Sequence, residues 1–324
     1  MFHIRTVALA LLAAAFVDPA GAQVARIEVH TLATQTLSVA EFLSGRKDGK
    51  RDTIAGELRI PRAGTDRLPA VILMHGTSGA QENIQDWSEL LNAMGVATFV
   101  LDSFTGRGIS SASGLAGAVG PLQRSVDAFR SLELLAKHPR IDRDRIAVMG
   151  FSHGAYAALY SSVKRFARLH GPADGLQFAA HIVFYPGCNL TFLEGDDVSD
   201  RPVRVFHGSE DDWLPVAPCR DYAARLRSSG KDVVLTEYAG AHHSFDRRTL
   251  KEPVKDTQAT SFVRCRLEET ADGQFLNIAT SQPFTPRDAC VERGRTSTTA
   301  YHAPAHAEAV KAVTELIAAT LKPK

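Results

Sequence analysis

The chain has 324 residues, of which 44% are hydrophobic and 23% are charged, and its formal net charge at pH 7 is +1. This is the composition of an ordinary globular protein. A charge so close to neutral argues against nucleic acid or an anionic membrane surface as the main partner.

The first 22 residues have the pattern of a cleavable signal peptide. Arg5 precedes an apolar run at residues 7–17, and the small residues 20–22 (A-G-A) follow it. This run is shorter than the roughly 20 apolar residues that a membrane anchor needs, and no later stretch is long and apolar enough to span a bilayer. We therefore predict cleavage after Ala22, a single mature domain at residues 23–324, and a periplasmic or secreted location.

From residue 67 onward, strand and helix patterns alternate along the chain. Continuous apolar runs are typical of strands that are buried on both faces of a parallel sheet, and the alternation predicts helices on both of those faces. Residues 27–32 and 53–60 precede this pattern and predict an antiparallel pair at the sheet edge. The predicted core strands are residues 69–74, 96–101, 145–149, 181–185, 202–206 and 232–238, and the predicted helices are residues 87–94, 121–137, 154–165, 219–228 and 305–321.

Residues 251–300, here called the excursion, interrupt the pattern between the last core strand and the final helix. They contain a predicted hairpin at residues 263–270 and 274–280, around the turn signal at Asp272 and Gly273. We expect the excursion to be closed by a disulfide.

The four cysteines of an exported chain predict two disulfides. Of the three possible pairings we favour Cys188–Cys219, because these residues follow two neighbouring strands, and Cys265–Cys290, which closes the excursion. The closely spaced cysteine pairs of a zinc site are missing. We therefore expect no metal.

Residues 150–154 (G-F-S-H-G) fit the G-x-S-x-G pattern, which is weak evidence by itself. Their position strengthens it, because the nucleophile elbow of an α/β hydrolase likewise follows a strand and opens a helix. A serine that only caps the helix is the alternative. The sequence therefore predicts an α/β fold of the α/β-hydrolase type, with a mostly parallel central sheet and Ser152 as nucleophile.

A serine nucleophile needs a base, and the base needs an orienting acid. In this fold the chain order is serine, acid, histidine. Two loops after Ser152 follow predicted strands, at residues 207–215 (H-G-S-E-D-D-W-L-P) and 239–246 (A-G-A-H-H-S-F-D). Both lie at carboxyl ends of strands, where sites of α/β proteins assemble. The candidate acids are Glu210, Asp211 and Asp212, and the candidate bases are His242 and His243.

Residues 150–154, 207–215 and 243–245 (H-S-F) resemble the corresponding segments of the dienelactone hydrolase family, and the resemblance covers about residues 50–250. Residues 75–76 (H-G) and 102–108 (D-S-F-T-G-R-G) occur in the order that the family shows. In that family the acid stands three residues after the glycine of H-G, and the base stands two residues before the phenylalanine.

This spacing implies that Asp211 is the acid and His243 is the base. Asp212 and His242 are then neighbours that bond the loops. The enzymes that give the family its name use cysteine where this chain has Ser152, so we expect a general esterase rather than an enzyme that cleaves dienelactone. A hydroxyl has a much higher pKa than a thiol, so Ser152 depends on the histidine to take its proton.

A tetrahedral intermediate needs an oxyanion hole. We expect one donor to be the backbone N–H of His153, and the other to come from Thr77 in the loop after the first parallel strand. Phe104 and Trp213 are expected either to line the pocket or to pack the loops. Arg107 is expected either to bind a substrate carboxylate or to anchor its own loop to an internal carboxylate or carbonyl.

These features predict a serine hydrolase that cleaves a small-molecule carboxylic ester through an acyl-enzyme. The alternatives are a peptidase or acyltransferase that uses the same three residues, and a binding protein that keeps the fold without the chemistry. The sequence has neither a Walker loop nor a dinucleotide fingerprint. We therefore expect no cofactor.

Overall fold

A computed structural model of the protein describes residues 24–110, 120–262 and 264–323. The predicted signal peptide, residues 1–22, lies outside the described residues. The core is an eight-stranded sheet in the order β1-β2-β4-β3-β5-β6-β8-β9. Its strands are β1 (Arg26–Thr36), β2 (Lys50–Ile60), β3 (Leu68–Met74), β4 (Ala97–Asp102), β5 (Ile141–Phe151), β6 (His181–Phe184), β8 (Val203–Gly208) and β9 (Val233–Tyr238).

The six strands from β4 to β9 in this order run parallel to one another, whereas β1 pairs antiparallel with β2 and β2 pairs antiparallel with β4. Every residue of β3 is buried, as a continuous apolar run between two helical layers requires. The predicted parallel sheet and its antiparallel edge pair are therefore confirmed.

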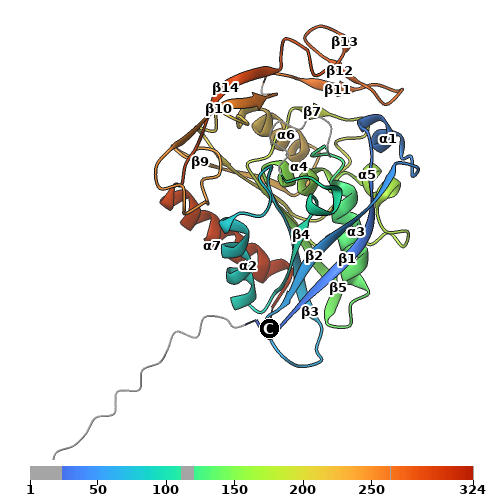
Figure 1. Ribbon diagram of the computed structural model, residues 1–324, viewed down its shortest axis with the longest axis vertical. Helices are drawn as coiled ribbons and strands as arrows, with labels where there is room; N and C mark the ends of the chain where they lie inside the picture. Colours follow the sequence, from blue (N-terminus) through green and yellow to red (C-terminus); the bar gives the residue numbers. More distant parts are fainter. Residues whose placement is uncertain (1–23, 111–119, 263, 324) are drawn as a thin grey trace, which may run out of the picture.

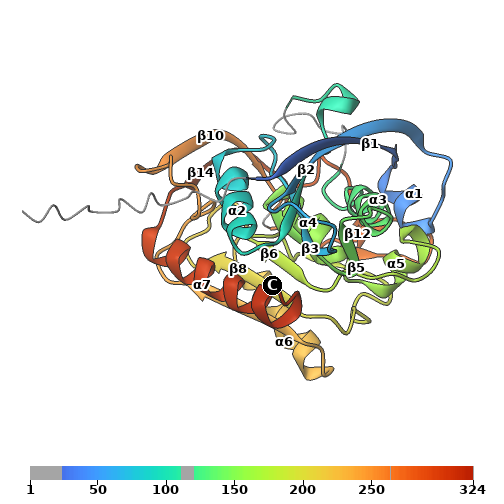
Figure 2. The same cartoon turned by 90° about the horizontal axis from the view of Figure 1, so that it is seen from below.

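Helices cover both faces of the sheet. Helices α2 (Glu82–Ala93) and α7 (Ala303–Thr320) pack on one face, and α3 (Ser125–Ala136), α4 (His153–Tyr160), α5 (Lys164–His170) and α6 (Ala217–Ser228) pack on the other. Figures 1 and 2 both show α2 and α7 on the opposite side of the sheet from α3 and α5. The short elements α1 (Val39–Ser44) and η1 (Thr105–Arg107) complete the helices. None of the helices among the described residues has the length and apolar character needed to cross a membrane.

The predicted single helix at residues 154–165 is wrong, because α4 ends at Tyr160 and α5 begins only at Lys164. The hydroxyls of Ser161 and Ser162 donate to the carbonyls of Ala158 and Leu159, at 3.0 and 2.5 Å. Serine side chains that bond nearby carbonyls compete with helical continuation. The chain is extended at Val163, which forms a bridge to Val198.

The excursion forms two small sheets at the top of the molecule in Figure 1. The predicted hairpin is present as β11 (Leu267–Glu269) and β12 (Phe275–Asn277), and Gly273 has the positive φ of 76° that its turn needs. Strands β13 (Gln282–Pro283) and β7 (Leu190–Thr191) flank the hairpin. A second pair, β10 (Val254–Ser261) with β14 (Glu292–Thr299), was not predicted. Both predicted disulfides, Cys188–Cys219 and Cys265–Cys290, are formed.

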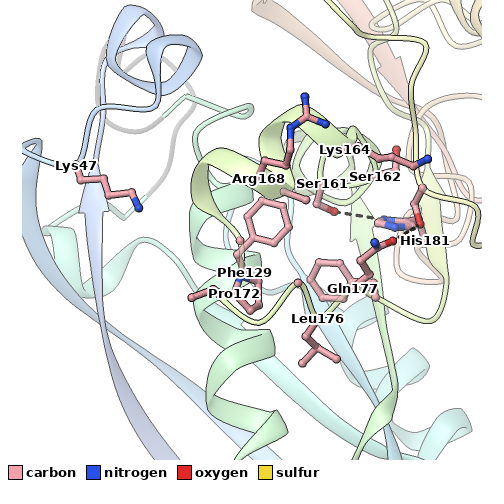
Figure 3. Close-up of a pocket in the computed structure, with 16 residues that line it drawn as sticks. Lys47, Phe129, Ser161, Ser162, Lys164, Arg168, Pro172, Leu176, Gln177 and His181 are labelled. Atoms are coloured by element: carbon pink, nitrogen blue, oxygen red, sulfur yellow. Dashed lines mark hydrogen bonds between the residues drawn. The ribbon is translucent and has the colours of Figure 1, made fainter.

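A cavity of about 600 Å³ lies near the amino-terminal end of β6. Figure 3 shows His181, the first residue of β6, facing Ser161 within it, with the His181 Nδ1 3.3 Å from the serine Oγ. The same Nδ1 lies 2.9 Å from the Ala158 carbonyl oxygen, so it carries the proton and donates to that carbonyl. Burial lowers the pKa of His181 to about 4, although the bond to Ala158 opposes this shift. The ring is therefore neutral in the folded protein at neutral pH.

We predict that His181 makes the protein less stable in mild acid. The unfolded chain protonates this residue near its ordinary pKa of 6.5 and the folded chain only near 4, so the unfolded state binds more protons between these values and stability falls as the pH is lowered. Replacing His181→Phe keeps an aromatic ring beside Phe178 and removes this proton. It is expected to reduce the slope of unfolding free energy against pH by about 1 kcal/mol per pH unit near pH 5.

Urea denaturation of both proteins between pH 4.5 and 7 measures this slope. The wild type and the His181→Phe variant share the other buried histidines, so the difference between their slopes is due to His181. Equal slopes would contradict the prediction.

Candidate active site

Ser152 stands in a sharp turn between β5 and α4, with φ 51° and ψ −113°. A non-glycine residue rarely adopts a positive φ, and the turn exists because two glycines allow close packing around it. A Cβ on Gly150 would collide with the carbonyl oxygen of Gly154, and a Cβ on Gly154 would collide with that of Met74 at the end of β3. The predicted elbow is therefore present, with strand, strained serine and helix in order.

Three side chains from three loops form one chain of hydrogen bonds. The His243 Nε2 lies 2.9 Å from the Ser152 Oγ, and its Nδ1 lies 2.7 Å from the Asp211 Oδ2. Asp211 follows β8 and His243 follows β9, and each is only 3% exposed. Burial raises the pKa of Asp211, but its interactions with His243, with His207 and with the Leu214 N–H together outweigh burial and lower it. Asp211 is therefore an ionised acceptor for the Nδ1 proton.

The loop around Asp211 holds its carboxylate in one orientation. The backbone N–H groups of Trp213 and Leu214 donate to its Oδ1 at 3.0 and 2.8 Å, which leaves Oδ2 for the histidine. The acid loop and the base loop are also bonded to each other, since the N–H of Glu210 donates to the carbonyl of Ala241 at 3.0 Å. The acid and the base are therefore placed as one unit.

The neighbouring candidates have other partners. Asp212 accepts the backbone N–H of Thr298 at 2.7 Å and its hydroxyl at 3.0 Å, so it bonds the excursion instead of the histidine. The His242 Nδ1 lies 2.9 Å from the Glu210 carbonyl oxygen. Of the alternatives that the sequence left open, the geometry brings only Asp211 and His243 into line with Ser152.

Sequence reasoning missed two residues behind His243. The Tyr185 ring packs edge-on against the imidazole at a centroid distance of 4.6 Å, and its hydroxyl donates to the Asp246 Oδ1 at 2.7 Å. Asp246 is completely buried and also accepts hydrogen bonds from Trp87 Nε1 and Asn83 Nδ2, at 2.9 and 3.1 Å. The one sequence signal was an acid three residues after His243, whereas its partners come from distant elements.

The two predicted oxyanion-hole residues belong to segments that adjoin Ser152. His153 is the first residue of α4, where backbone N–H groups have no partner within the helix. Thr77 lies in a turn closed by a bond from the Gly79 N–H to the Gly76 carbonyl. Gly76 lies against the nucleophile, because a Cβ there would be 3.6 Å from the Ser152 Cβ.

The three predicted pocket residues have different surroundings. Phe104 is only 2% exposed and packs against the His75 ring at 4.5 Å, which matches loop packing rather than pocket lining. The Arg107 side chain is 2% exposed and donates to both oxygens of Asp127 at 2.8 and 2.9 Å, so it anchors its loop internally and is not placed to bind substrate. Trp213 is partly exposed, and its ring lies 5.3 Å from the imidazole of His243.

The excursion lies directly beside the hydrogen-bonded chain. Residue Thr299 of β14 forms a bridge with His243, and the N–H of Ala300 donates to the His243 carbonyl at 3.2 Å. The Ser261 hydroxyl at the end of β10 donates to the Trp213 carbonyl at 3.1 Å. The β10–β14 pair therefore contacts the acid loop and the base loop together.

Among the residues that the structure describes, one group has side chains of the kinds that bind metal ions. Glu28, His30 and His138 have ligand atoms within 4.8 Å of one another, and each histidine Nε2 lies beside the Glu28 Oε2, at 2.9 and 3.1 Å. The His138 Nδ1 accepts the backbone N–H of Arg140 at 3.2 Å. Its Nε2 is therefore the nitrogen that donates to Glu28. The group links β1 to the loop after α3 by hydrogen bonds.

A serine elbow with an acid and a histidine after successive strands, on a mostly parallel sheet covered on both faces, defines the α/β-hydrolase class. The chain belongs to the dienelactone hydrolase family, whose model matches residues 54–267. This membership confirms the family resemblance of the sequence and makes the protein a member of a hydrolase family.

The proteins that are similar to this chain include two solved structures and one curated protein. The match to a putative dienelactone hydrolase from Klebsiella pneumoniae covers 68% of this chain and 90% of that protein's chain, with TM-score 0.50 and 18% identity. The match to a dienelactone hydrolase-like promiscuous phosphotriesterase from metagenomic libraries covers 91% of this chain and 98% of that protein's chain, with TM-score 0.56 and 15% identity. At these identities the two structures show the shared fold. A probable 2-oxo-3-(5-oxofuran-2-ylidene)propanoate lactonase from a Bradyrhizobium species is 25% identical over 190 residues, which is 56% of this chain and 75% of that protein.

We predict that Asp212 holds the excursion against the acid loop. Replacing Asp212→Ala removes both bonds to Thr298, a loss of about 1.5 kcal/mol, which corresponds to roughly tenfold more frequent local opening. Limited proteolysis of the folded protein is expected to cleave residues 251–300 about tenfold faster in this variant. Asp212→Asn retains an oxygen that accepts the Thr298 N–H, and it serves as the matched control. Identical cleavage rates for the alanine variant and the wild type would refute this role.

Proposed function

We propose that the protein is a serine hydrolase that cleaves carboxylic esters through an acyl-enzyme on Ser152. The observation that carries the proposal is the hydrogen-bonded chain from the Ser152 Oγ through His243 to the ionised Asp211. A serine hydroxyl becomes a useful nucleophile when an adjacent base takes its proton, and the base works when an acid fixes its tautomer. The family to which the chain belongs supports hydrolysis as the reaction class.

In the proposed acylation step, the Ser152 Oγ attacks the ester carbonyl carbon while its proton passes to the His243 Nε2. The tetrahedral intermediate collapses when the bond from carbon to the alcohol oxygen breaks, and His243 gives its proton to the departing alcohol. Water then attacks the acyl-enzyme by the same route and releases the carboxylic acid. Asp211 keeps the other histidine proton on Nδ1 and stabilises the imidazolium that forms in each half of the reaction.

The oxyanion of the intermediate is proposed to lie between the backbone N–H groups of His153 and Thr77. Two features support this assignment: His153 opens α4 beside Ser152, and Gly76 brings the Thr77 turn against the serine. A preformed pair of donors at this position stabilises the developing negative charge, and each donor is worth about 2.7–4 kcal/mol in the transition state.

The proposed substrate is a small-molecule ester. A lactone is a cyclic ester, so the name of the Bradyrhizobium relative is in keeping with this bond type. Trp213 is proposed as one wall of the substrate pocket, because its ring is partly exposed beside His243. Two disulfides support the proposed periplasmic or secreted location, since disulfides persist in oxidising compartments.

A fluorophosphonate probe tests the reaction class. The purified mature protein is expected to be labelled at Ser152 and to hydrolyse short p-nitrophenyl esters, whereas Ser152→Ala is expected to do neither. A wild-type protein that takes up no label would favour the binding-protein alternative. A protein that is labelled but inactive on these esters would favour a peptidase or an acyltransferase.

Two neighbouring carboxylates provide a test of the assigned acid. Asp211→Asn is expected to lower kcat by about 10⁴-fold, because the amide favours the wrong histidine tautomer. Asp212→Asn is expected to keep kcat within a few-fold of the wild type, because Asp212 bonds Thr298 rather than His243. Steady-state kinetics on the same ester compares the variants, and the opposite ranking would overturn the assignment.

A further inference from the structure

Arg124, the residue before α3, is completely buried close to Ser152. Its Nη1 donates to the carbonyl oxygen of His75 at 2.8 Å and lies 3.0 Å from the His153 Nδ1. Because a guanidinium only donates hydrogen bonds, that Nδ1 is the acceptor and the His153 proton is on Nε2. One nitrogen atom therefore joins the end of β3 to the start of α4.

These two partners belong to the two halves of the proposed oxyanion hole. His75 directly precedes the turn that carries Thr77, and the backbone N–H of His153 is the other proposed donor. We propose that Arg124 is the positioning residue of the oxyanion hole, which holds both donor segments at a fixed distance from Ser152. This inference rests on the proposed ester hydrolysis and adds a residue that acts through the backbone rather than by touching substrate.

Aromatic rings pack around the Nη1 side of Arg124, whereas its Nε and Nη2 are buried without a hydrogen-bond partner among the described residues. The Phe104 ring lies under the guanidinium at 5.0 Å, and it packs edge-on against the rings of His75 and His153, at 4.5 and 6.0 Å. The His75 Nδ1 donates to the Gly76 carbonyl at 2.8 Å, and its Nε2 accepts the Ser103 N–H at 3.3 Å. Each polar atom of the His75 ring therefore has a role in shaping the loop.

The charge of Arg124 also has the sign that an oxyanion needs. Burial lowers its pKa to about 10, so it remains a cation at neutral pH. The nearby carboxylates of Asp127 and Asp102 both raise the pKa of Arg124 and so oppose this shift. Each carboxylate is hydrogen-bonded elsewhere, Asp127 to Arg107 and Thr34 and Asp102 to backbone N–H groups. Burial and the Arg124 cation lower the pKa of His75 to about 3, so His75 stays neutral. The Arg124 cation, which contacts His75 and His153, thus has the sign that favours an anion developing at the two donors.

Steady-state kinetics and inhibitor binding test this role. Arg124→Met is expected to lower kcat on a p-nitrophenyl ester by about 100-fold with KM within threefold, because a small misplacement of catalytic groups costs this much. The Ki of a trifluoromethyl ketone, whose adduct with Ser152 carries an oxyanion, is expected to rise by the same factor. Arg124→Lys keeps the charge and one donor, so it is expected to fall between Arg124→Met and the wild type in both measurements.

Arg145→Met is the matched control. Arg145 donates to the carbonyls of Leu321 and Lys322 near the start of β5, whereas Ser152 follows the end of that strand. This variant is expected to lose thermal stability and keep kcat and Ki. A folded Arg124→Met protein with wild-type kcat, or with reduced kcat and an unchanged Ki, would overturn the inference.

Circular dichroism and labelling separate the remaining outcomes. If Arg124→Met does not fold, a folded Arg124→Lys protein with wild-type kcat and Ki overturns the inference on its own. If the wild-type protein is not labelled by fluorophosphonate, the proposed function fails and this inference fails with it. A labelled, active wild type with an unaffected Arg124 variant rejects the inference and leaves the proposed function standing.

Discussion

The site depends on one strained backbone position, Ser152 at φ 51°. Such a conformation persists only when surrounding structure holds it, and here β5 and α4 hold it from both sides. The absence of side chains at Gly150 and Gly154 lets the helix approach the strand and the end of β3. That close approach also brings the loop after β3 against the serine, so the elbow and the loop that faces it form together.

The other two members of the hydrogen-bonded chain come from the parallel arrangement of β8 and β9. Because neighbouring parallel strands end at the same edge of the sheet, the loops that carry Asp211 and His243 meet there and bond to each other. The β10–β14 pair then contacts both loops through Thr298 and Thr299. The excursion is thus a brace on the acid and the base, in addition to any part it has in the shape of the pocket.

Buried polar groups pack against the residues of the site and hold them in place. Asp246 is held by Tyr185, Trp87 and Asn83, and the tyrosine ring packs against the imidazole of His243. Polar groups that are buried with partners make an arrangement specific, because any shift leaves one of them unpaired. On the nucleophile side, Arg124 contacts His75 and His153 through its Nη1.

The sequence by itself determined the strands of the main sheet and the elbow, because apolar runs and a strand–glycine–serine–glycine–helix order are local signals. The cysteine count predicted two disulfides, whereas their pairing followed from which strands are neighbours. The capping box at Ser38 and Glu41 was also a local signal, and it marks α1, which was not predicted. Only the tertiary structure decided that Arg107 anchors a loop, since its partner Asp127 is 20 residues away. The same holds for the β10–β14 pair, for Asp246 and for Arg124, because their partners are separated by long stretches of chain and meet only when the sheet has formed.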